Sequence, residues 1–273
     1  MSSLRNLGPV MLVGAGKMGL AMARGWLDAG LPPSSLVLVD PAPSDDARVL
    51  ADDYDLVINS QASGLVPNVL VLAVKPQIIG PVMAGLLPVV GPQTLVLSIA
   101  AGISIARLSE GLGTGRIVRT MPNTPAQLGK GITGAVAGPE VGHDDRGNAD
   151  ALLAAAGPVV WFDAESDLDA VTAVSGSGPA YVFNLVEALA AAGQAQGLPE
   201  HVAMKLARQT VIGAAALLEA DPAPASVLRQ NVTSPNGTTA AALAVLMAPD
   251  GLTPLMEKAV AAARQRSEEL GRG

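Results

Sequence analysis

The sequence predicts an α/β domain with a mostly parallel β-sheet, followed by an all-α second half. Two observations predict this fold class. Short apolar, β-rich segments alternate with helical ones as far as about residue 163, and from residue 164 nearly every segment has a helical pattern. A chain of 273 residues is long enough for two domains, which we place at residues 1–163 and 164–273.

The composition narrows the possible functions. A formal net charge of −7 argues against nucleic acid or an anionic membrane as the main partner. The absence of cysteine excludes disulfides and thiolate chemistry, and two histidines argue against a histidine-based metal site, so we expect no metal. Neither a signal sequence nor an apolar run of about 18 residues is present, so we expect a soluble, cytoplasmic protein.

The first motif is a glycine-rich turn between a strand and a helix. Val10–Val13 is a short apolar strand, and a helical pattern runs from Met18 to about Ala29. The residues that join the strand to the helix and form the start of the helix are Gly14, Ala15, Gly16, Lys17, Met18 and Gly19. They have the spacing G-x-G-x-x-G. This spacing allows a tight turn, a close approach of the backbone to a pyrophosphate and close helix–strand packing. It predicts a Rossmann-type dinucleotide site, and a purely structural glycine turn is the alternative.

An acidic residue ends the second strand, Leu36–Val39. Asp40 lies about 20 residues past the glycines, where an acid takes the adenosine ribose hydroxyls and disfavours a 2′-phosphate. The nearest following arginine is Arg48, so this residue favours NADH over NADPH. The alternative is that Asp40-Pro41 is an ordinary turn.

Further strands should bring more residues to the same edge of the sheet. Ligands bind at the carboxyl ends of parallel strands, so Val74, Lys75 and Pro76, which end the strand Val69–Val74, should line the cofactor. Asn123 and Thr124 lie between two prolines after the strand Arg116–Thr120, and we expect this loop near the nicotinamide unless it is only a turn. The remaining predicted strands are Leu56–Ile58, Leu95–Ser98, Thr133–Ala137 and Val159–Phe162.

The helical half begins near Ser166, where Ser166-x-x-Asp169 is close to a capping box. In the run Val174–Tyr181, Gly176 and Gly178 allow a tight backbone path before a helix. That run is either one wall of an anion or substrate pocket or a well-capped helix at a domain boundary. The predicted helices are 179–192, 199–219, 238–248 and 252–270. Several are apolar on nearly all sides, which predicts an interlocked homodimer.

A second helix N-terminus follows the segment Asn231–Thr239, which is rich in hydroxyls and carries no charge. This N-terminus and the one at Ser177–Tyr181 could hold a small carboxylate through backbone N–H groups without arginine. The alternative is an ordinary Thr-capped helix.

Together these motifs identify a family. G-A-G-K-M-G, A-V-K-P-Q, M-P-N-T-P, S-G-S-G-P-A-Y and V-T-S-P-N-G-T-T have the order and spacing of the pyrroline-5-carboxylate reductase family, which the chain resembles over almost its whole length. The resemblance implies NAD(P)H-dependent reduction of the cyclic imine 1-pyrroline-5-carboxylate to L-proline, the last step of proline biosynthesis. It also implies a Rossmann-type domain and a helical dimerisation domain, often in a ring of dimers.

The resemblance also implies roles for particular residues. Those expected at the cofactor phosphates are Gly14, Ala15, Lys17 and Met18, and those on the nicotinamide side are Ala73, Val74, Lys75 and Pro76. One wall of the substrate pocket would consist of Ser175, Ser177 and Gly178. The substrate carboxylate would bind to Ser234, Gly237 and Thr238, delivered by the partner subunit, with Thr238 placed against the imine nitrogen as the catalytic residue.

The sequence departs from the family pattern at two places. Asn236 replaces a glycine before Gly237, and we expect the loop to survive because asparagine tolerates a left-handed backbone. The adenosine-side asparagine of the family has no clear counterpart at Asn59-Ser60, so Ser60 is our candidate and both NADPH and NADH stay open.

Two other functions are alternatives. A β-hydroxyacid dehydrogenase shares the glycine fingerprint but uses a lysine about where Val182 lies, and no lysine or arginine follows in that helix before Lys205. A non-catalytic NAD(P)-binding sensor would not need the two later motifs.

Overall fold

The computed structural model describes residues 4–271. Its internal contacts divide the described residues into two compact units, residues 4–176 with 263–271 and residues 177–262. The predicted fold class is confirmed, because the first unit contains a mostly parallel sheet with helices and the second is entirely helical. The domain boundary at 163/164 stays a prediction; the last strand ends at Phe162, whereas the compact units divide after Gly176.

The sheet of the first unit has eight strands in the order β3-β2-β1-β4-β5-β6-β7-β8. β6 and β7 pair antiparallel, and every other neighbouring pair is parallel. The reversal of chain order beside β1 places the end of that strand at a topological switch point, where open α/β sheets bind ligands. The strands are β1 Val10–Val13, β2 Leu36–Val39, β3 Ile58–Asn59, β4 Val69–Leu72, β5 Leu95–Ser98, β6 Ile117–Met121, β7 Thr133–Ala137 and β8 Val159–Phe162.

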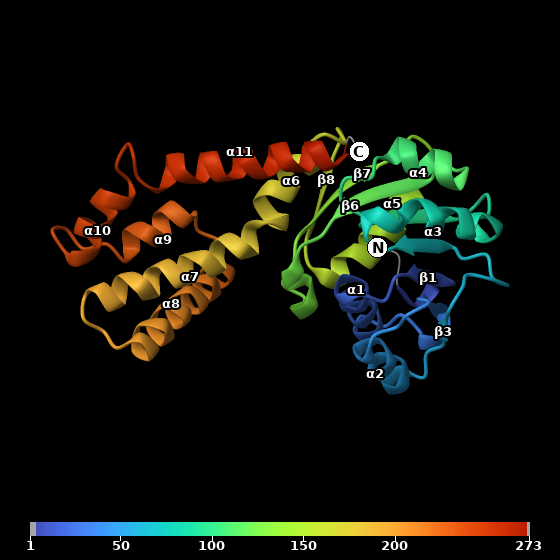
Figure 1. Cartoon of the computed structure of the whole chain (residues 1–273), viewed down its shortest axis with the longest axis horizontal. Helices are drawn as coiled ribbons and strands as arrows, with labels where there is room; N and C mark the ends of the chain where they lie inside the picture. Colours follow the sequence, from blue (N-terminus) through green and yellow to red (C-terminus); the bar gives the residue numbers. More distant parts are fainter. Residues whose placement is uncertain (1–3, 272–273) are drawn as a thin grey trace. The chain divides into compact units, whose positions relative to one another are not determined.

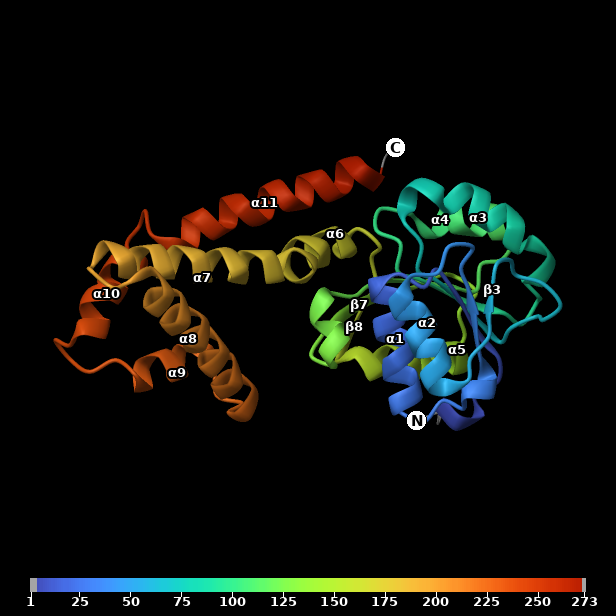
Figure 2. The same ribbon diagram turned by 60° about the horizontal axis from the view of Figure 1, so that its bottom comes forward.

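Helices cover both faces of this sheet (Figures 1 and 2). Alternate residues of one strand point to opposite faces, so Val10 and Leu12 of β1 pack in one core while Met11 and Val13 pack in the other. The first core includes α1, α2 and α5, and the second includes α3 and α4. The helices are α1 Lys17–Asp28, α2 Asp45–Tyr54, α3 Ile79–Leu86, α4 Ile105–Leu112, α5 His143–Leu153 and α6 Asp167–Val171. Short 3₁₀ turns cover Leu4–Asn6, Pro33–Ser35, Pro76–Ile78, Leu87–Val89, Thr124–Leu128 and Ala154–Ala156.

Three strands differ from the prediction, and one of them, β6, is displaced by one residue, to Ile117–Met121 instead of Arg116–Thr120. β3 begins at Ile58 rather than Leu56, because Asp55 ends α2 in a left-handed conformation and the Leu56 N–H donates to the Ala51 carbonyl. β4 ends at Leu72 rather than Val74, because the backbone of Ala73 turns against Gly14.

The expected capping box at Ser166 is absent. Ser166 has a helical backbone and its side chain makes no capping hydrogen bond. Asp169 instead accepts a hydrogen bond at 2.7 Å from the hydroxyl of Ser267, in α11 (Leu252–Gly271). Ser267 is buried, and farther along the helix the Leu270 carbonyl lies against Gly102. The end of α11 therefore belongs to the sheet-containing unit.

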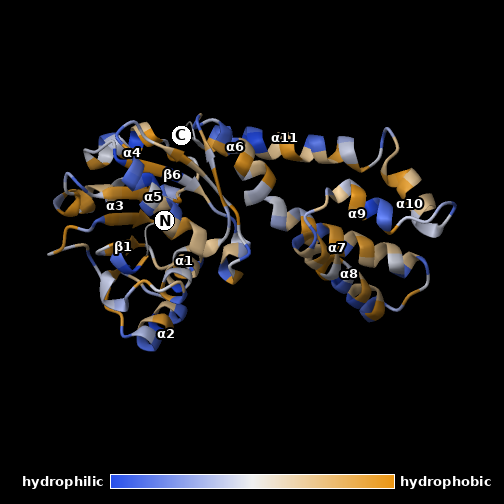
Figure 3. Ribbon diagram, turned by 180° about the vertical axis from the view of Figure 1, so that it is seen from behind, coloured by the Kyte–Doolittle hydropathy of each residue, from blue (hydrophilic) through white to orange (hydrophobic). Residues whose placement is uncertain are grey.

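The helical unit has almost no core of its own. It contains α7 Gly178–Ala195, α8 Glu200–Ala220, α9 Ala225–Asn231, α10 Thr238–Leu246 and the start of α11. Only Ala190, Ala203 and Ala207 are buried in α7 to α10. Many large apolar side chains are exposed, and Figure 3 shows apolar residues along α7, α8 and α10. These side chains are Val182, Phe183, Leu185, Leu189, Leu198, Met204, Leu206, Ile212, Leu217, Leu218, Val227, Val232, Val245, Leu246, Met247, Leu252 and Leu255.

Within residues 4–271, none of the helices combines the length and the apolar character needed to cross a lipid bilayer.

Candidate active site

The glycine turn lies at the carboxyl end of β1. The surroundings of its three glycines differ, so each position favours glycine for a different reason. Gly14 has φ +98°, and a Cβ there would lie 2.6 Å from the Ala73 carbonyl oxygen. A Cβ on Gly19 would lie 2.3 Å from the Gly14 carbonyl oxygen, so this glycine permits α1 to pack close to the turn. Gly16 is exposed and has open space where its Cβ would be. The backbone at Gly16 is therefore accessible, as a pyrophosphate requires.

Helix α1 begins directly after this glycine, with Gly16 as its N-cap and no side chain capping it. The first N–H groups of a helix have no partner within the helix, and with the helix dipole they favour an anion. Gly16, Lys17, Met18 and Gly19 thus lie where a phosphate could meet backbone N–H groups. These features fit the diphosphate of a dinucleotide.

Asp40 is fixed by two backbone hydrogen bonds at the end of β2. One carboxylate oxygen accepts from the N–H of Ala15 at 2.8 Å, and the other accepts from the N–H of Ala42 at 2.9 Å. The Ala15 N–H is therefore directed to this carboxylate rather than to a phosphate. Because both oxygens are held, the side chain has a defined orientation next to the glycine turn.

A cleft of about 610 Å³ connects the ends of β1, β2 and β4. It brings together four predicted cofactor residues, namely Gly14, Asp40, Ser60 and Val74. Its other lining residues are Val13, Val39, Pro41, Ala42, Gln61, Ala62, Ile78, Pro81, Val82, Gly85 and Leu86. Such a cleft, mostly apolar with a few polar groups, suits an adenosine.

Sequence reasoning missed part of this lining. Ile78 and Gln61 were not predicted, although one signal was available for Ile78. The signal is its position, because Ile78 is an apolar residue shortly after Lys75-Pro76. In the structure, half of its surface is exposed. Gln61 follows Ser60 in an irregular segment, where periodicity gives no information.

The other nine predicted cofactor residues do not line this cleft; they are Ala15, Gly16, Lys17, Met18, Gly19, Ala73, Lys75, Pro76 and Asn123. Lys75 is exposed and precedes the 3₁₀ turn that begins at Pro76. Lys17, the lysine of the glycine motif, lines a separate cleft of about 310 Å³ together with Arg24 and Asp46.

Asn123 links two of the predicted motifs. Its side-chain amide donates to the backbone carbonyl of Ser175 at 3.2 Å, and its carbonyl oxygen accepts from the N–H of Ile132 at 3.0 Å. The M-P-N-T-P loop and the start of the S-G-S-G-P-A-Y motif are thus held together within the first unit. Asn123 has a positioning role that the sequence did not indicate.

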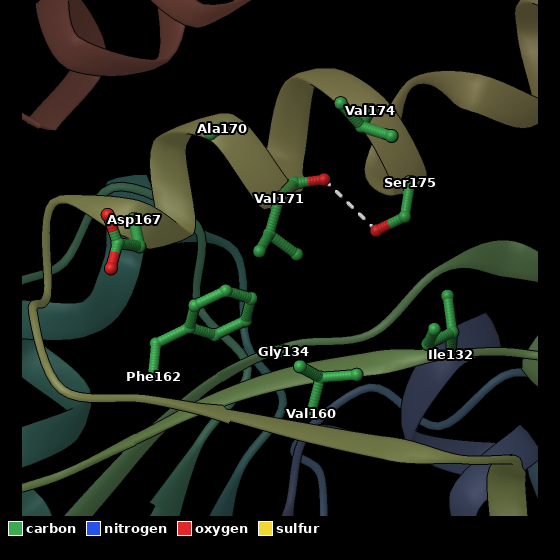
Figure 4. A pocket seen from close by; sticks show the side chains of 9 residues that line it. All are labelled: Ile132, Gly134, Val160, Phe162, Asp167, Ala170, Val171, Val174 and Ser175. Carbon is green, nitrogen blue, oxygen red and sulfur yellow. Dashed lines mark hydrogen bonds between the residues drawn. The ribbon is translucent and has the colours of Figure 1, made fainter.

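A second cleft, of about 350 Å³, lies beside this link (Figure 4). Its lining is apolar except for Asp167 and Ser175. The hydroxyl of Ser175 donates to the Val171 carbonyl at 3.0 Å, as the dashed line in Figure 4 marks. The remaining lining residues are Ile132, Gly134, Val160, Phe162, Ala170, Val171 and Val174.

The glycine turn expected at Gly176 is instead a π-helical turn, Thr172–Gly176. Ser177 has a helical backbone, and α7 begins at Gly178 with Pro179 in its first turn. The Cα of Gly176 approaches the methyl group of Met121, where a Cβ would lie 2.8 Å from that carbon. Single π turns are frequent at functional sites, because they redirect a short segment of helix backbone.

The segment Asn231–Thr239 leads into a helix N-terminus within the helical unit. Asn236 has φ +57°, so the backbone here is left-handed, as expected for the residue that replaces a glycine. The Gly237 N–H donates to the Ser234 carbonyl at 3.1 Å, and a Cβ on Gly237 would meet the Ser234 hydroxyl at 2.3 Å. Thr238 is the first residue of α10 and is exposed.

The described residues contain no group of three His, Asp or Glu side chains that could hold a metal ion.

Comparisons with known proteins decide the family. A family model described as pyrroline-5-carboxylate reductase dimerisation matches residues 165–270, and one described as NADP oxidoreductase, coenzyme F420-dependent, matches residues 9–102. The pyrroline-5-carboxylate reductase of Pseudomonas aeruginosa is 41% identical over 96% of both chains. The chain belongs to the pyrroline-5-carboxylate reductase family. The recognition of this family from its motifs is therefore confirmed.

Other family members agree in sequence and in structure. The enzyme of Glycine max is 38% identical over 94% of both chains. The solved reductase from Coxiella burnetii is 34% identical and has a TM-score of 0.90, covering 97% of this chain and 99% of that one. The Plasmodium falciparum enzyme, solved with NADP bound, is 29% identical with a TM-score of 0.78, covering 96% and 98%.

Proposed function

We propose that this protein reduces 1-pyrroline-5-carboxylate to L-proline with NADPH or NADH. The observation that carries the proposal is the glycine turn at the end of β1, in a family member that matches its relatives over nearly the whole length. Gly14 and Gly19 cannot carry a Cβ there, whereas the space at Gly16 is open for a diphosphate.

Bound NAD(P)H would supply a hydride to the imine carbon. The chain's part is to orient the two reactants and exclude other reactions, because a protonated imine is already a strong electrophile. This suits a site whose motifs contain neither histidine nor cysteine. Gly16, Lys17 and Met18 would hold the diphosphate, Asp40 and Ser60 the adenosine side, and the residues Ala73 to Pro76 with Asn123 the nicotinamide side.

The substrate would contact two of the sequence motifs, the second of them delivered by the partner subunit. Ser175, Ser177 and Gly178 would form one wall, and the segment with Ser234, Gly237 and Thr238 would bind the carboxylate. Thr238 is the first residue of α10, and the N-terminus of a helix favours an anion. The hydroxyl of Thr238 would hydrogen-bond the ring nitrogen and hold or relay its proton.

We also propose that the protein functions as a homodimer, with a ring of dimers as the larger assembly. The exposed apolar side chains of α7 and α8 support the dimer, since a monomer would leave them in water. Residues 165–270 match the dimerisation model of the family.

One observation disfavours a β-hydroxyacid dehydrogenase. α7 carries no lysine or arginine, and its only charged residue is Glu187. A proton-transferring lysine is thus absent from the helix that would have to carry it.

The activity test is the oxidation of NADH and of NADPH by the pure protein, with and without 1-pyrroline-5-carboxylate. Oxidation that depends on the imine supports the reductase. Binding of a cofactor without any imine-dependent oxidation would contradict it and would favour a sensor.

The role of Thr238 can be tested with three variants. Thr238→Ala removes the hydroxyl and should lower kcat/KM by about 100-fold, the lower end of what a positioned proton donor contributes. Thr238→Ser keeps the hydroxyl and should retain most activity. Thr239→Ala, the neighbouring threonine on α10, is the matched control and should resemble the wild type. Wild-type kcat and KM in Thr238→Ala would disprove the role.

A further inference from the structure

The segment before α10 contains the one Asn-Gly dipeptide of the chain, Asn236-Gly237. Asn236 is exposed, and its φ of +57° lies in the left-handed region that residues other than glycine seldom adopt. It stands where the family pattern has a glycine. The side-chain amide at this position is therefore a departure of this chain from the pattern, next to the start of α10.

An asparagine followed by glycine can lose its side-chain amide without a catalyst. The backbone nitrogen of the glycine gives up its proton and attacks the side-chain carbonyl carbon of the asparagine. This step forms a succinimide ring and releases ammonia, and water then opens the ring to give aspartate or isoaspartate. The net reaction consumes water, needs neither an oxidant nor a reductant, and adds one negative charge to the protein.

The surroundings of Gly237 decide whether this ring can close. A glycine has no Cβ to obstruct the approach of its nitrogen to the preceding side chain. That nitrogen donates to the Ser234 carbonyl at 3.1 Å, so this hydrogen bond must open first. The bond lies outside α10, which begins at Thr238, and its opening also releases the left-handed backbone of Asn236. The ring can therefore close while the helix stays intact.

Other asparagines lack this combination. Asn231 precedes Val232, whose branched side chain hinders attack by the valine nitrogen. The side-chain amides of Asn68 and Asn123 each donate to a backbone carbonyl, at 3.2 Å in both cases. Asn236 is thus the asparagine at which deamidation should occur first.

A carboxylate at residue 236 would lie one residue before Gly237, the N-cap of α10. The positive end of the helix dipole favours this carboxylate for the same reason that it favours the carboxylate of a substrate. The two anions would compete for one place and repel each other. Isoaspartate would in addition insert a methylene group into the main chain before Gly237.

We propose that Asn236 is a deamidation site and that its deamidation weakens the binding of the substrate carboxylate. The second part rests on the reductase function proposed above. The first part is independent of that function, so the two can fail separately.

Mass spectrometry tests the modification. The full-length protein is incubated at mildly alkaline pH, which favours loss of the glycine amide proton, and is then digested with trypsin. Cleavage after Arg229 and Lys258 places Asn231 and Asn236 in one peptide, so Asn231 is an internal control. We expect conversion at Asn236 and an intact Asn231. A synthetic peptide of residues 232–239 is incubated alongside, and an unchanged Asn236 in the protein after full conversion of this peptide would overturn the proposal.

Kinetics before and after the incubation test the consequence. The KM for 1-pyrroline-5-carboxylate should rise by about tenfold or more, the scale of one pair of like charges near a protein surface. The Kd for NADH should stay within about twofold of its starting value in calorimetry. A converted protein with its starting KM would overturn the second part of the proposal. Fresh protein without imine-dependent oxidation would instead contradict the reductase function, and the mass spectra would still decide the modification.

Variants assign the change in KM to residue 236. Asn236→Asp carries the charge of the product and should have the raised KM from the start. Asn236→Gly restores the glycine of the family and should keep its KM through the incubation. Asn6→Asp makes the same charge change at an exposed position of the sheet-containing unit and should leave the KM unchanged. A rise in KM during incubation of Asn236→Gly would contradict the assignment, and the wild-type time course still decides the proposal if Asn236→Asp does not fold.

Discussion

The three glycines of the G-x-G-x-x-G motif have different roles. The spacing G-x-G-x-x-G predicted all three, and the structure assigns a reason to each. Gly14 and Gly19 are required by the fold, since a Cβ at either position would overlap a backbone oxygen. At Gly16 a Cβ would meet nothing in the protein.

Gly16→Ala should therefore separate cofactor binding from folding. Gly16 has an extended backbone, φ −79° and ψ −178°, which alanine readily adopts. We expect the free energy of unfolding to fall by less than about 1 kcal/mol, the scale of a change of N-cap residue. The new methyl group would occupy the place of the diphosphate, so the Kd for NADH should rise by about tenfold or more.

The control for this substitution is Gly80→Ala. Gly80 is an exposed glycine on α3 with open space at its Cβ position. It should leave the Kd for NADH unchanged in calorimetry. If Gly16→Ala bound NADH as tightly as Gly80→Ala, the diphosphate could not lie at Gly16.

At the scale of elements, the end of α11 is fixed to the sheet-containing unit by a buried polar contact. Ser267→Ala removes the hydroxyl that donates to Asp169 at 2.7 Å. The carboxylate would lose this donor, so the free energy of unfolding should fall by about 1–3 kcal/mol. Chemical denaturation at one protein concentration measures the change, because the stability of an oligomer depends on concentration.

Ser63→Ala is the matched control for this contact, since Ser63 is exposed in a loop. It should alter the free energy of unfolding by less than about 0.5 kcal/mol. Equal effects of the two substitutions would show that the Ser267–Asp169 hydrogen bond does not stabilise the fold.

Most elements could be predicted from the sequence because their signals are local. Strands such as Leu95–Ser98 are apolar on both faces, and the predicted bounds of five strands agree with the structure. Boundaries set by contacts distant in sequence could not be predicted. β4 ends early because Ala73 meets the glycine turn, and Asp169 binds Ser267 98 residues away rather than capping its own helix.

Only part of the candidate site could be predicted, because some of its contacts also join residues that are distant in sequence. Residues within a motif, such as Gly14 and Asp40, have a spacing that implies their role. The hydrogen bond from Asn123 to Ser175 and the place of Ile78 in the cleft depend on how separate loops meet. The π turn at Thr172–Gly176 has no sequence signature that distinguishes it from a glycine turn.

At the scale of the whole molecule, the exposed apolar side chains predict an assembly that a charge can disrupt. Leu217 on α8 is 61% exposed, and Leu87 in the sheet-containing unit is 51% exposed. Leu217→Glu should lower the molar mass measured by size-exclusion chromatography with light scattering, because a charge cannot be buried without a partner. Leu87→Glu is the control and should keep the wild-type mass. A wild-type protein that is monomeric in this measurement would contradict the proposed homodimer.

The return of α11 to the sheet-containing unit has a consequence for synthesis on the ribosome. Residues 263–271 leave the exit tunnel only after the whole of residues 177–262 has been made, although they pack with residues 4–176. The parallel sheet can form early, as N-terminal domains generally do during translation. Its contact with Ser267 must wait until translation has passed through the helical unit. The nascent chain therefore carries a nearly complete nucleotide-binding unit, with Asp169 still lacking its buried partner, while the helical unit is being made.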